Sequence, residues 1–521
     1  MSMRLLDCTV RDGGYINDWN FGNKTIKNIF KKLVAAGVDI VEVGFLRNCE
    51  YSQDRTLYNN IAEIKPVLPK EKGNTKFVAM ALHNMYDITK LEPCDGTIAG
   101  VRVTFHDYDI DEGLEFCKKV LEKGYECYCQ PINIMGYTDE QILGIVKKVN
   151  AIKPTGFAIV DTFGSMMKED LLRIAMIVDN NLDPSITMGV HLHENLSLSY
   201  SLAQEFINLL INRRNIIVDG SLSGMGRVPG NLCIELISDY MNRVCGKNYD
   251  ADALLDAIND YILPIKEKTP WGYSAPYSIS AKYNLHRNYA ENLVDRGVLT
   301  AKDMNHILAM IEPHKKTVFD KDYIEKLFYE YQSKVIDDKE DMVALKKVIV
   351  GIEVLVVAPG KSIVEYEETI NDYIGVNHPV VICANFISES IKHDFAFFTN
   401  TKRYEDVSKE NESVIVTSNL IRDGKHAGYA VNYNNLVSIG ESGSNNVIML
   451  LKLLKLLGAS KVSLAGCDGY SKDKANYFDN NMAQAHKISA ENNQNMAARI
   501  KQLSENLEIT FLTPSNYEGL L

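Results

Sequence analysis

Long apolar runs are missing from this sequence of 521 residues. No stretch of about 18 consecutive apolar residues occurs, and a membrane-spanning helix requires one. The N-terminal letters MSMRLLDCTV enter a predicted strand at once, without the apolar segment of a cleavable signal. We therefore expect a cytoplasmic protein with no membrane partner.

A cysteine framework is also missing, although the chain has 10 cysteines. They are scattered, and the closest pair, Cys127 and Cys129, lies within one predicted strand. Such spacing is typical of a reduced intracellular protein. We expect buried free thiols rather than a cysteine metal site.

No basic stripe occurs, and the net charge of -12 is spread along the chain. This distribution argues against nucleic acid or an anionic membrane as a partner. The length exceeds what a single hydrophobic core normally fills, so we predict two domains.

What the first half does contain is a regular alternation of β-rich and helical segments. The helical segments, such as TIKNIFKKLVAAG, repeat apolar residues at three- and four-residue spacing and end in glycine. Eight units of this kind predict a (β/α)8 TIM barrel over residues 1–245. The β-rich runs are RLLDCTV, IVEVGFL, KFVAMAL, GVRVTFH, YECYCQPINI, GFAIVDTFG, TMGVHLH and IIVDGSLSG.

Unusual polar residues fall where these predicted strands end, which is where such barrels place their active sites. They are Arg11, Asp12, Glu42, Arg102, Gln130, Asp161, Thr162, His191, His193 and, in the loop after the eighth strand, Asn231.

His191 and His193 are two residues apart in a predicted strand, so both imidazoles face the same side. In a closed barrel the first and seventh strands are separated only by the eighth, so Asp12 can join them around one ion. Two imidazoles and a carboxylate suit a divalent metal, Mn²⁺ or Mg²⁺ above all, with Zn²⁺ or Co²⁺ as alternatives. Non-haem iron oxygenases use the same ligand set and are a rival interpretation.

Three motifs, DCTVRDGG, HLHENLSLS and GSLSGMGRVPGN, occur in this order. Together they resemble the barrel metalloenzymes that include 4-hydroxy-2-oxovalerate aldolase, HMG-CoA lyase and isopropylmalate synthase. The resemblance covers about residues 3–290. It implies that Arg11 holds an enolate oxygen and that Asp12, His191, His193 and Asn231 bind the metal. On this interpretation Arg11 and Asp12 need not pair with each other.

The letters NLSL after the histidines resemble the aldolase branch of this family, which favours a pyruvate-type enolate over Claisen condensation with acetyl-CoA.

Three further residues are candidates for supporting roles. The segment APYSISAKYNLHRNYA resembles the aldolase segment that brings a tyrosine over the active site, so Tyr277 is a candidate acid or simply a packing residue. Glu42 either orients Arg11 or is a solvated strand-end acid. The resemblance also implies that Asp161 supports the site without binding metal.

Tyr15 departs from the family pattern, because the aldolases carry a histidine base at this position. A phenol is a poorer base than imidazole near neutral pH. Either a metal-bound water, Tyr15 or another residue takes the proton, or the substrate differs from those of the known aldolases.

The second half has a different pattern. Residues 246–340 read as a charged helical extension with a linker near DDKED. A new domain, 341–521, begins with the apolar β-run KKVIVGIEVLVV, a turn APGKS and an amphipathic helix. The turn would expose backbone N–H groups, an anion site, although the Walker A spacing is absent. Later β-runs predict a Rossmann-like open α/β sheet.

The set VVAPGKSIVEY, VICANF and VSLAGCDGYS is similar to the nucleotide-binding half of bacterial sialyltransferases and related glycosyltransferase-like domains. That similarity implies contacts from Gly360, Ser362 and Asn385 to a cytidine nucleotide. His486 is either a base or, as a single helical histidine, structural.

We therefore predict a divalent-metal aldolase-type lyase fused to a nucleotide or nucleotide-sugar binding domain, in bacterial surface-polysaccharide precursor metabolism. Its expected substrates are a keto acid and an aldehyde or sugar-derived compound, and we expect a homo-oligomer. The alternative is an acetyl-CoA-dependent Claisen synthase with a non-catalytic regulatory C-terminal domain.

Overall fold

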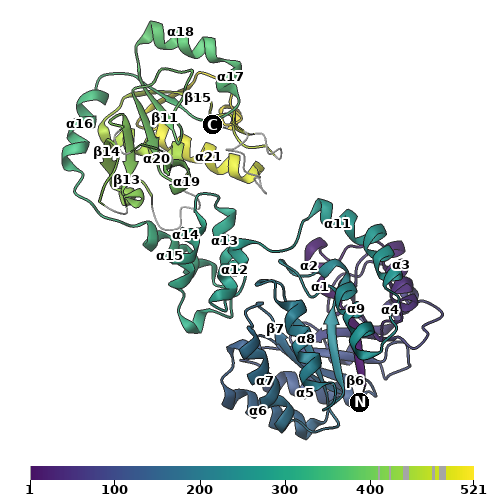
Figure 1. Ribbon diagram of the computed structural model, residues 1–521. Helices are drawn as coiled ribbons and strands as arrows, with labels where there is room; N and C mark the ends of the chain where they lie inside the picture. The colour runs from purple at the N-terminus through teal and green to yellow at the C-terminus, as the bar shows by residue number, and fades with distance from the viewer. Residues whose placement is uncertain are drawn as a thin grey trace. The chain divides into compact units, whose positions relative to one another are not determined.

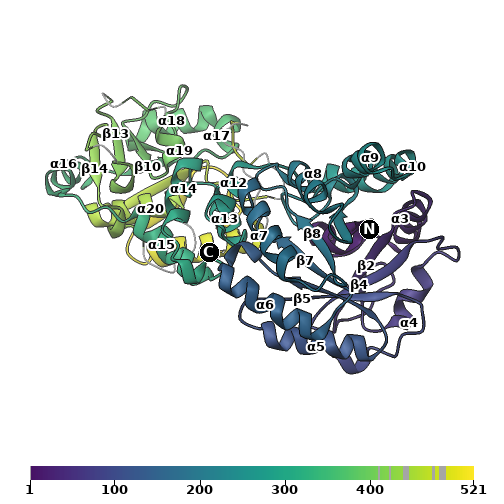
Figure 2. The ribbon, with the colours of Figure 1, turned by 60° about the horizontal axis from the view of Figure 1, so that its bottom comes forward.

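The computed structural model describes residues 2–520 except 406, 409–410, 422–423, 438–444, 472–475 and 480–488. The chain forms two compact units (Figures 1 and 2). The barrel unit contains Met1–Ala290 and Glu312–Phe319, and the sheet unit contains Glu291–Ile311 and Asp320–Leu521. The predicted helical extension is thus shared between the two units.

The barrel unit closes eight parallel strands into a ring, which confirms the predicted TIM-like barrel. The ring closes because β1 pairs with both β2 and β9. Its strands are β1 (Met3–Asp7), β2 (Ile40–Leu46), β4 (Lys76–Leu82), β5 (Gly100–Phe105), β6 (Glu126–Pro131), β7 (Gly156–Asp161), β8 (Thr187–Leu192) and β9 (Ile216–Gly220). A two-residue strand, β3 (Leu57–Tyr58), adds to β2 outside the ring.

Amphipathic helices surround the ring and bury their apolar stripes against it, as their three- and four-residue spacing predicted. They are α3 (Asn23–Ala35), α4 (Ile61–Ile64), α5 (Ile110–Glu122), α6 (Asp139–Ile152), α7 (Lys168–Asn181), α8 (Ser199–Leu210) and α9 (Ile234–Cys245). Strand β2 shows why the ring is stable, since all seven of its residues are buried.

The first predicted strand ends earlier than its apolar letters suggest. Asp7 accepts hydrogen bonds from the backbone N–H and the hydroxyl of Thr9, and the chain turns into the short helix α1 (Thr9–Asp12). Arg11 and Asp12 therefore stand on a helical turn, followed by α2 (Gly14–Asn17), above the end of β1.

Helices follow the barrel, as predicted. They are α10 (Ala251–Ala257), α11 (Leu263–Lys268), α12 (Ala275–Lys282), α13 (Asn288–Asp295), α14 (Ala301–Ala309), α15 (Lys321–Gln332) and α16 (Lys339–Ile349), with a π-helical turn at Ile258–Ile262. Within the described residues, no helix has both the length and the apolar composition needed to cross a membrane.

Two expectations for the start of the second domain are wrong. The letters KKVI belong to α16, because Leu345 and Ile349 are buried at helical spacing, and the strand begins only at Val354. DDKED is no linker, since Asp338 and Asp341 accept hydrogen bonds from the backbone of Asn432 and Ala430.

The sheet unit is built on a seven-stranded, fully parallel sheet, which agrees with the predicted open α/β class. Its spatial order is β14-β13-β12-β11-β10-β15-β16. The strands are β10 (Val354–Val357), β11 (Val380–Ala384), β12 (Phe395–Phe398), β13 (Val414–Thr417), β14 (Tyr429–Val431), β15 (Lys461–Ala465) and β16 (Glu508–Phe511).

Two apolar cores cover the two faces of this sheet, as a parallel sheet requires. The helices between its strands are α17 (Ser362–Glu365), α18 (Glu367–Asn377), α19 (Thr401–Tyr404), α20 (Asn446–Leu457) and α21 (Ser489–Ser504). The strand order reverses between β10 and β15, so ligands are expected beyond the carboxyl ends of these two strands.

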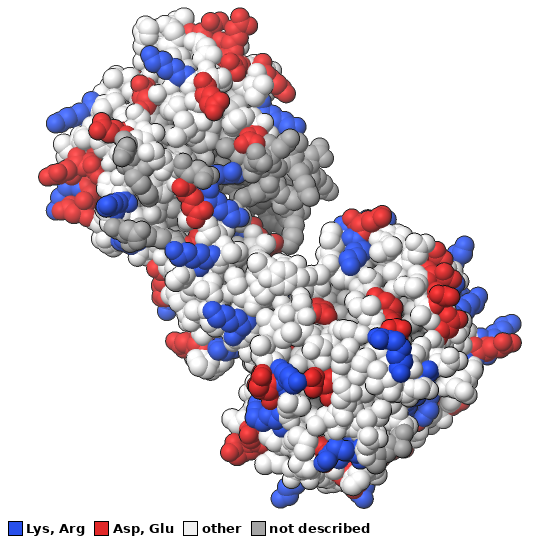
Figure 3. Space-filling model, viewed as in Figure 1, with Lys and Arg blue, Asp and Glu red and all other residues white. Residues whose placement is uncertain are grey.

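Acidic and basic side chains are interspersed on the face of each unit that Figure 3 shows. This agrees with the even charge distribution of the sequence.

Candidate functional site

Asp12, His191 and His193 meet at the carboxyl end of the barrel, as the sequence predicted. One ligand atom from each lies within 4.8 Å of the others. The two imidazole rings have centroids 5.1 Å apart, and all three residues are buried. Asp12 thus joins two histidines that follow it by 179 and 181 positions in one small cluster of metal-ligating atoms.

Asn231 completes this cluster. Its Nδ2 donates to Asp12 Oδ2 over 2.8 Å, while its Oδ1 is buried and, among the described residues, has no hydrogen-bond partner. An unsatisfied buried acceptor is costly unless a ligand meets it. The four residues therefore fit a divalent ion, with Asp12 and the amide oxygen as hard donors and the histidines as nitrogen donors.

Protonation in the cluster also suits a metal. Burial, together with the cationic neighbourhood, lowers the pKa of His193 to about 3, so its imidazole is neutral. Burial alone would raise the pKa of Asp12, but the Arg11 guanidinium and the hydrogen bond from Asn231 hold it well below its usual range. A neutral imidazole and an ionised carboxylate are the forms that bind metal.

Asp219, on β9, orients His191. Its Oδ2 lies 3.1 Å from His191 Nδ1, which places the proton on Nδ1 and leaves Nε2 as the ligand atom. Asp219 also pairs with Arg102 from β5. Sequence reasoning missed Asp219, and the only available signal was a charged residue within a buried strand.

A chain of alternating charges links the first ligand to the second through the barrel interior. Arg11 Nη1 contacts Asp12 Oδ1 and Arg11 Nε contacts Glu42 Oε2, each over 2.5 Å. Glu42 Oε1 is 3.2 Å from Arg102 Nη1, and Arg102 reaches Asp219. Each buried charge thus has a partner, as burial in a low-dielectric interior requires.

The placement of Arg11 bears on two expectations. Glu42 does contact Arg11, whereas Arg11 and Asp12, which need not have paired, form an ion pair. Among the described residues, Arg11 Nη2 donates no hydrogen bond. The Nη2 group of Arg11 is therefore available to donate to a further oxygen, such as one of a substrate.

Tyr15, on α2, lies at the edge of the site and is 42% exposed. Its ring packs edge to face against Trp19, with centroids 4.8 Å apart, and under the Arg227 guanidinium at 5.4 Å. Tyr277, on α12, is half-buried, and its carbonyl accepts from Asn195 Nδ2 over 3.4 Å. The acid or base role predicted for either tyrosine stays a prediction.

Arg227 is a second residue that sequence reasoning missed, although it lies in the quoted motif GSLSGMGRVPGN. Its backbone N–H points to Asp12 Oδ2 over 3.4 Å, and its Nη2 is 3.2 Å from His286 Nε2. Burial and the nearby arginines lower the pKa of His286 to about 3, so His286 is a neutral acceptor. Arg227 is thereby held as a fixed positive charge beside the cluster.

Asp161 ends β7 and accepts hydrogen bonds from the backbone of Ser165 and Met166. Burial raises its pKa to about 7. Its contacts shape the loop after β7, which agrees with a supporting position.

Cys117, on α5, joins Cys127 and Cys129 of β6 in a second group of close ligand atoms. The Sγ atoms of Cys117 and Cys129 are 3.5 Å apart, and all three thiols are buried in the apolar core. All three are buried and form no disulfide, and the expectation that they bind no metal stays a prediction.

The sheet unit contains a cavity of about 470 Å³. It opens at the carboxyl ends of β10, β11, β12 and β15, where the strand order predicts a ligand. Gly360 and Asn385 line it, whereas Ser362 is buried and is not among the lining residues. His486 lies outside the described residues.

Comparisons with known proteins match the barrel. A family model described as HMGL-like covers residues 2–260. Oxaloacetate decarboxylase of Mycobacterium tuberculosis is 22% identical over 53% of this chain and 80% of its own length. 4-Hydroxy-2-oxovalerate aldolase of Pseudoalteromonas translucida is 20% identical over 51% of this chain and 77% of its own length.

Among solved structures, an N-terminal domain from Bacteroides vulgatus is 25% identical to this chain, with a TM-score of 0.48. It is aligned over 56% of this chain and 96% of its own length.

Proposed function

We propose that the barrel, whose residues 2–260 match the HMGL-like family model, is a divalent-metal lyase acting through the enolate of a 2-oxo acid. The enzyme is a carbon–carbon lyase, the class of its named relatives. The observation that carries the metal proposal is the cluster of Asp12, His191 and His193 with the unsatisfied Oδ1 of Asn231.

The substrate class follows from chemistry that the relatives' names share. Oxaloacetate and 4-hydroxy-2-oxovalerate are both 2-oxo acids. Breaking the bond between C3 and its substituent leaves an electron pair that the C2 carbonyl takes up as an enolate. A divalent ion would supply a Lewis acid that polarises this carbonyl.

The protein's own groups then act on that charge. Arg11 donates through its remaining Nη2 to the oxygen that becomes negative, while Glu42 and Asp12 hold the guanidinium in place. Asp219 keeps His191 in the ligating tautomer. Arg227, held by His286, is placed to pair with an anionic group of the substrate.

Tyr15 favours a second candidate beside aldol cleavage, namely loss of CO₂ from a 3-carboxylated 2-oxo acid. Aldol cleavage needs a base for the hydroxyl proton of the substrate, whereas decarboxylation needs none. A phenol packed against Trp19 and Arg227 suits the second reaction better than the first.

Metal analysis combined with deuterium exchange at C3 of pyruvate tests the barrel proposal. We expect the full chain to bind Mn²⁺ and to exchange the pyruvate methyl protons, and EDTA to abolish the exchange. His191→Ala should lose both properties, and His314→Ala, which removes an exposed histidine, should keep both.

Metal binding and exchange that persist in His191→Ala would contradict the barrel proposal. Turnover of acetyl-CoA without any pyruvate exchange would assign the synthase alternative instead. Release of pyruvate from oxaloacetate, but none from 4-hydroxy-2-oxo acids, would select decarboxylation over aldol cleavage.

We also propose that the sheet unit binds a nucleotide or nucleotide sugar and that the chain acts on a surface-polysaccharide precursor. The support for the nucleotide is the cavity at the reversal of strand order, a position at which parallel sheets bind nucleotides. The polysaccharide precursor rests on the sequence resemblance alone. Titration calorimetry of the full chain with CMP, CDP and UDP tests it, and no heat with any of them would overturn it.

A further inference from the structure

The turn after β10, from Pro359 to Ser362, already holds an anion of the protein itself. The Ser362 N–H donates to Asp468 Oδ2 over 2.9 Å, and the Ser362 hydroxyl donates to Asp468 Oδ1. The Gly360 N–H donates to Gly466 O over 2.9 Å. The Asp468 carboxylate thus occupies the place where the sequence predicted an anion site.

This arrangement works against phosphate at the turn. A phosphate there would have to displace Asp468 and would meet a like charge. Space is also short, since even a Cβ on Gly360 would come within 2.6 Å of the Asp468 carboxylate. We therefore expect a phosphate in the cavity to bind residues other than those of the Pro359–Ser362 turn.

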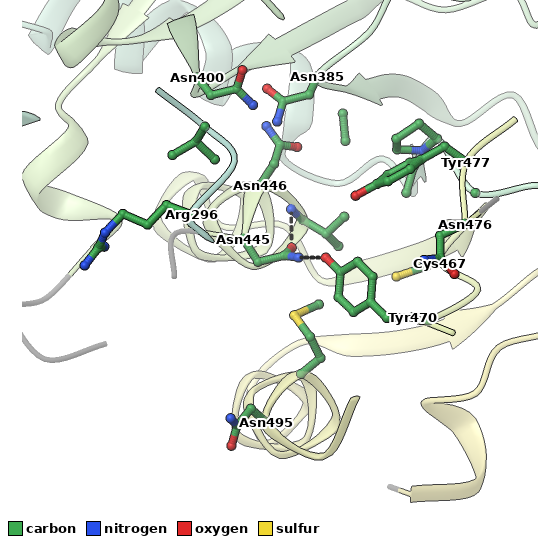
Figure 4. Close-up of a pocket in the computed structure, with 18 of the residues that line it drawn as sticks. Arg296, Asn385, Asn400, Asn445, Asn446, Cys467, Tyr470, Asn476, Tyr477 and Asn495 are labelled. Atoms are coloured by element: carbon green, nitrogen blue, oxygen red, sulfur yellow. Dashed lines mark hydrogen bonds between the residues drawn. The ribbon is translucent and has the colours of Figure 1, made fainter. Parts of the chain in front are cut away.

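Three arginines, Arg296, Arg403 and Arg499, line the cavity. Figure 4 shows the guanidinium of Arg296 directed away from the asparagine cluster. Arg403 lies on α19, one turn after Asn400, and Arg499 lies on α21, one turn after Asn495. Arg403 and Arg499 therefore line the cavity from two helices other than the one that follows the turn.

Three asparagines form a second recognition surface. Figure 4 shows the amides of Asn385, Asn400 and Asn446 gathered on one wall. Oδ1 of Asn385 and of Asn400 already accepts a backbone N–H, from Thr399 and Arg403 respectively. Each therefore offers its Nδ2 donors to a ligand.

Asn446 has the opposite arrangement. Its Nδ2 lies within 3.3 Å of Phe397 O and Thr399 Oγ1, while its buried Oδ1 has no hydrogen-bond partner among the described residues. The three amides together present two donor groups and one acceptor. The pairing edge of cytosine or uracil has two acceptors and one donor, whereas that of guanine has one acceptor and two donors.

We propose that this cavity binds a pyrimidine nucleotide, with its base against Asn385, Asn400 and Asn446 and its phosphate against Arg403 and Arg499 rather than the Pro359–Ser362 turn. The inference rests on the proposed nucleotide function and adds the orientation and base class of the ligand. The ring of Tyr477, which also lines the cavity, offers a face for stacking.

Calorimetry of the full chain with cytidine, CMP, UMP and GMP tests the inference. We expect CMP or UMP to bind more tightly than GMP, and CMP more tightly than cytidine. Arg499→Gln and Arg403→Gln should each weaken CMP binding about tenfold or more, because each variant loses a charge-assisted hydrogen bond to the phosphate. Both should leave cytidine binding unchanged. Ser362→Ala and Lys361→Gln are the matched controls at the turn and should keep the advantage of CMP over cytidine.

The outcomes separate the two levels of the proposal. If neither cytidine nor any nucleotide binds, the nucleotide function itself fails. If nucleotides bind but the turn variants, not the arginine variants, lose the advantage of CMP, the phosphate assignment is overturned. GMP binding as tightly as CMP would overturn the base assignment. Circular dichroism identifies any variant that fails to fold. If one arginine variant is unfolded, the CMP affinity of the other arginine variant tests the phosphate assignment.

Discussion

Asp219 joins the metal cluster to the charged interior of the barrel. It accepts from His191 on one side and pairs with Arg102 on the other. Arg102 is 2% exposed, so its charge depends on Asp219 and Glu42 for compensation. The Asp219 carboxylate therefore fixes the tautomer of His191 and also compensates the buried charge of Arg102.

We predict that Asp219→Asn lowers Mn²⁺ affinity about 10–100-fold. This is the usual effect of replacing a residue that hydrogen-bonds to a metal-ligating histidine. The amide still accepts from His191 Nδ1 but no longer carries the charge that compensates Arg102. Metal titration of the purified variant measures the effect.

Asp179→Asn is the control for this prediction. Asp179 is likewise buried, and it pairs with Arg213 and Arg214 outside the metal cluster, over 2.6 Å each. We expect this variant to lose stability and to keep wild-type Mn²⁺ affinity. Unchanged affinity in Asp219→Asn would mean that Asp219 only stabilises the barrel.

At the scale of elements, the loop between β9 and α9 closes the metal site from one side. It carries Arg227 and Asn231, and its backbone passes close to Asp12. Gly226 makes this close approach tolerable, because a Cβ there would lie 2.4 Å from Asn231 Nδ2 and 2.8 Å from Asp12 Oδ2. Glycine is required here for space rather than for an unusual backbone conformation.

We predict that Gly226→Ala weakens Mn²⁺ binding about tenfold or more. The new Cβ would overpack the site at a cost of about 1–3 kcal/mol and would displace two of the predicted metal ligands, Asn231 and Asp12. The control is Gly144→Ala in α6, where nothing lies within 4 Å of the new Cβ. That variant should bind metal normally and gain about 0.5–1 kcal/mol in unfolding free energy. Equal metal affinity in the two variants would contradict the role of Gly226.

The whole molecule combines two units, each with its own apolar core and its own candidate site. The metal cluster lies entirely within the barrel unit, and the cavity is lined only by residues of the sheet unit. Each ligand is therefore expected to stabilise the unit that binds it, by ~2.7 kcal/mol at a concentration of 100 times Kd.

Hydrogen exchange on the full chain checks this expectation. Mn²⁺ should protect the segments around Asp12 and His191, and CMP should protect the segments around Gly360 and Asn385. If Mn²⁺ alone strongly protected the segments around Gly360 and Asn385, the expectation that the two sites bind independently would be contradicted. Apo protein under the same conditions is the reference.

The sequence alone was sufficient for the barrel and for much of its candidate metal centre. Period-two and helical spacing predicted eight strands, and the i, i+2 pair His191 and His193 could only face one way in a strand. Those features are local, so neighbouring letters carry them. The same dependence on local letters made the prediction wrong at the start of the second domain. The apolar spacing of KKVIV fits a strand and a helix equally well, so the sequence could not show that these residues form a helix.

Spacing in the chain cannot reveal partners that come from distant elements. The ion pairs of Arg11 and Arg102, the support of His191 by Asp219 and the position of Arg227 all join residues brought together only when the barrel closes. The turn at Ser362 is the clearest case. Its letters determined a strand, a turn and a helix. Only the folded sheet brought Asp468 against Ser362 across 106 positions of sequence, because β15 pairs beside β10.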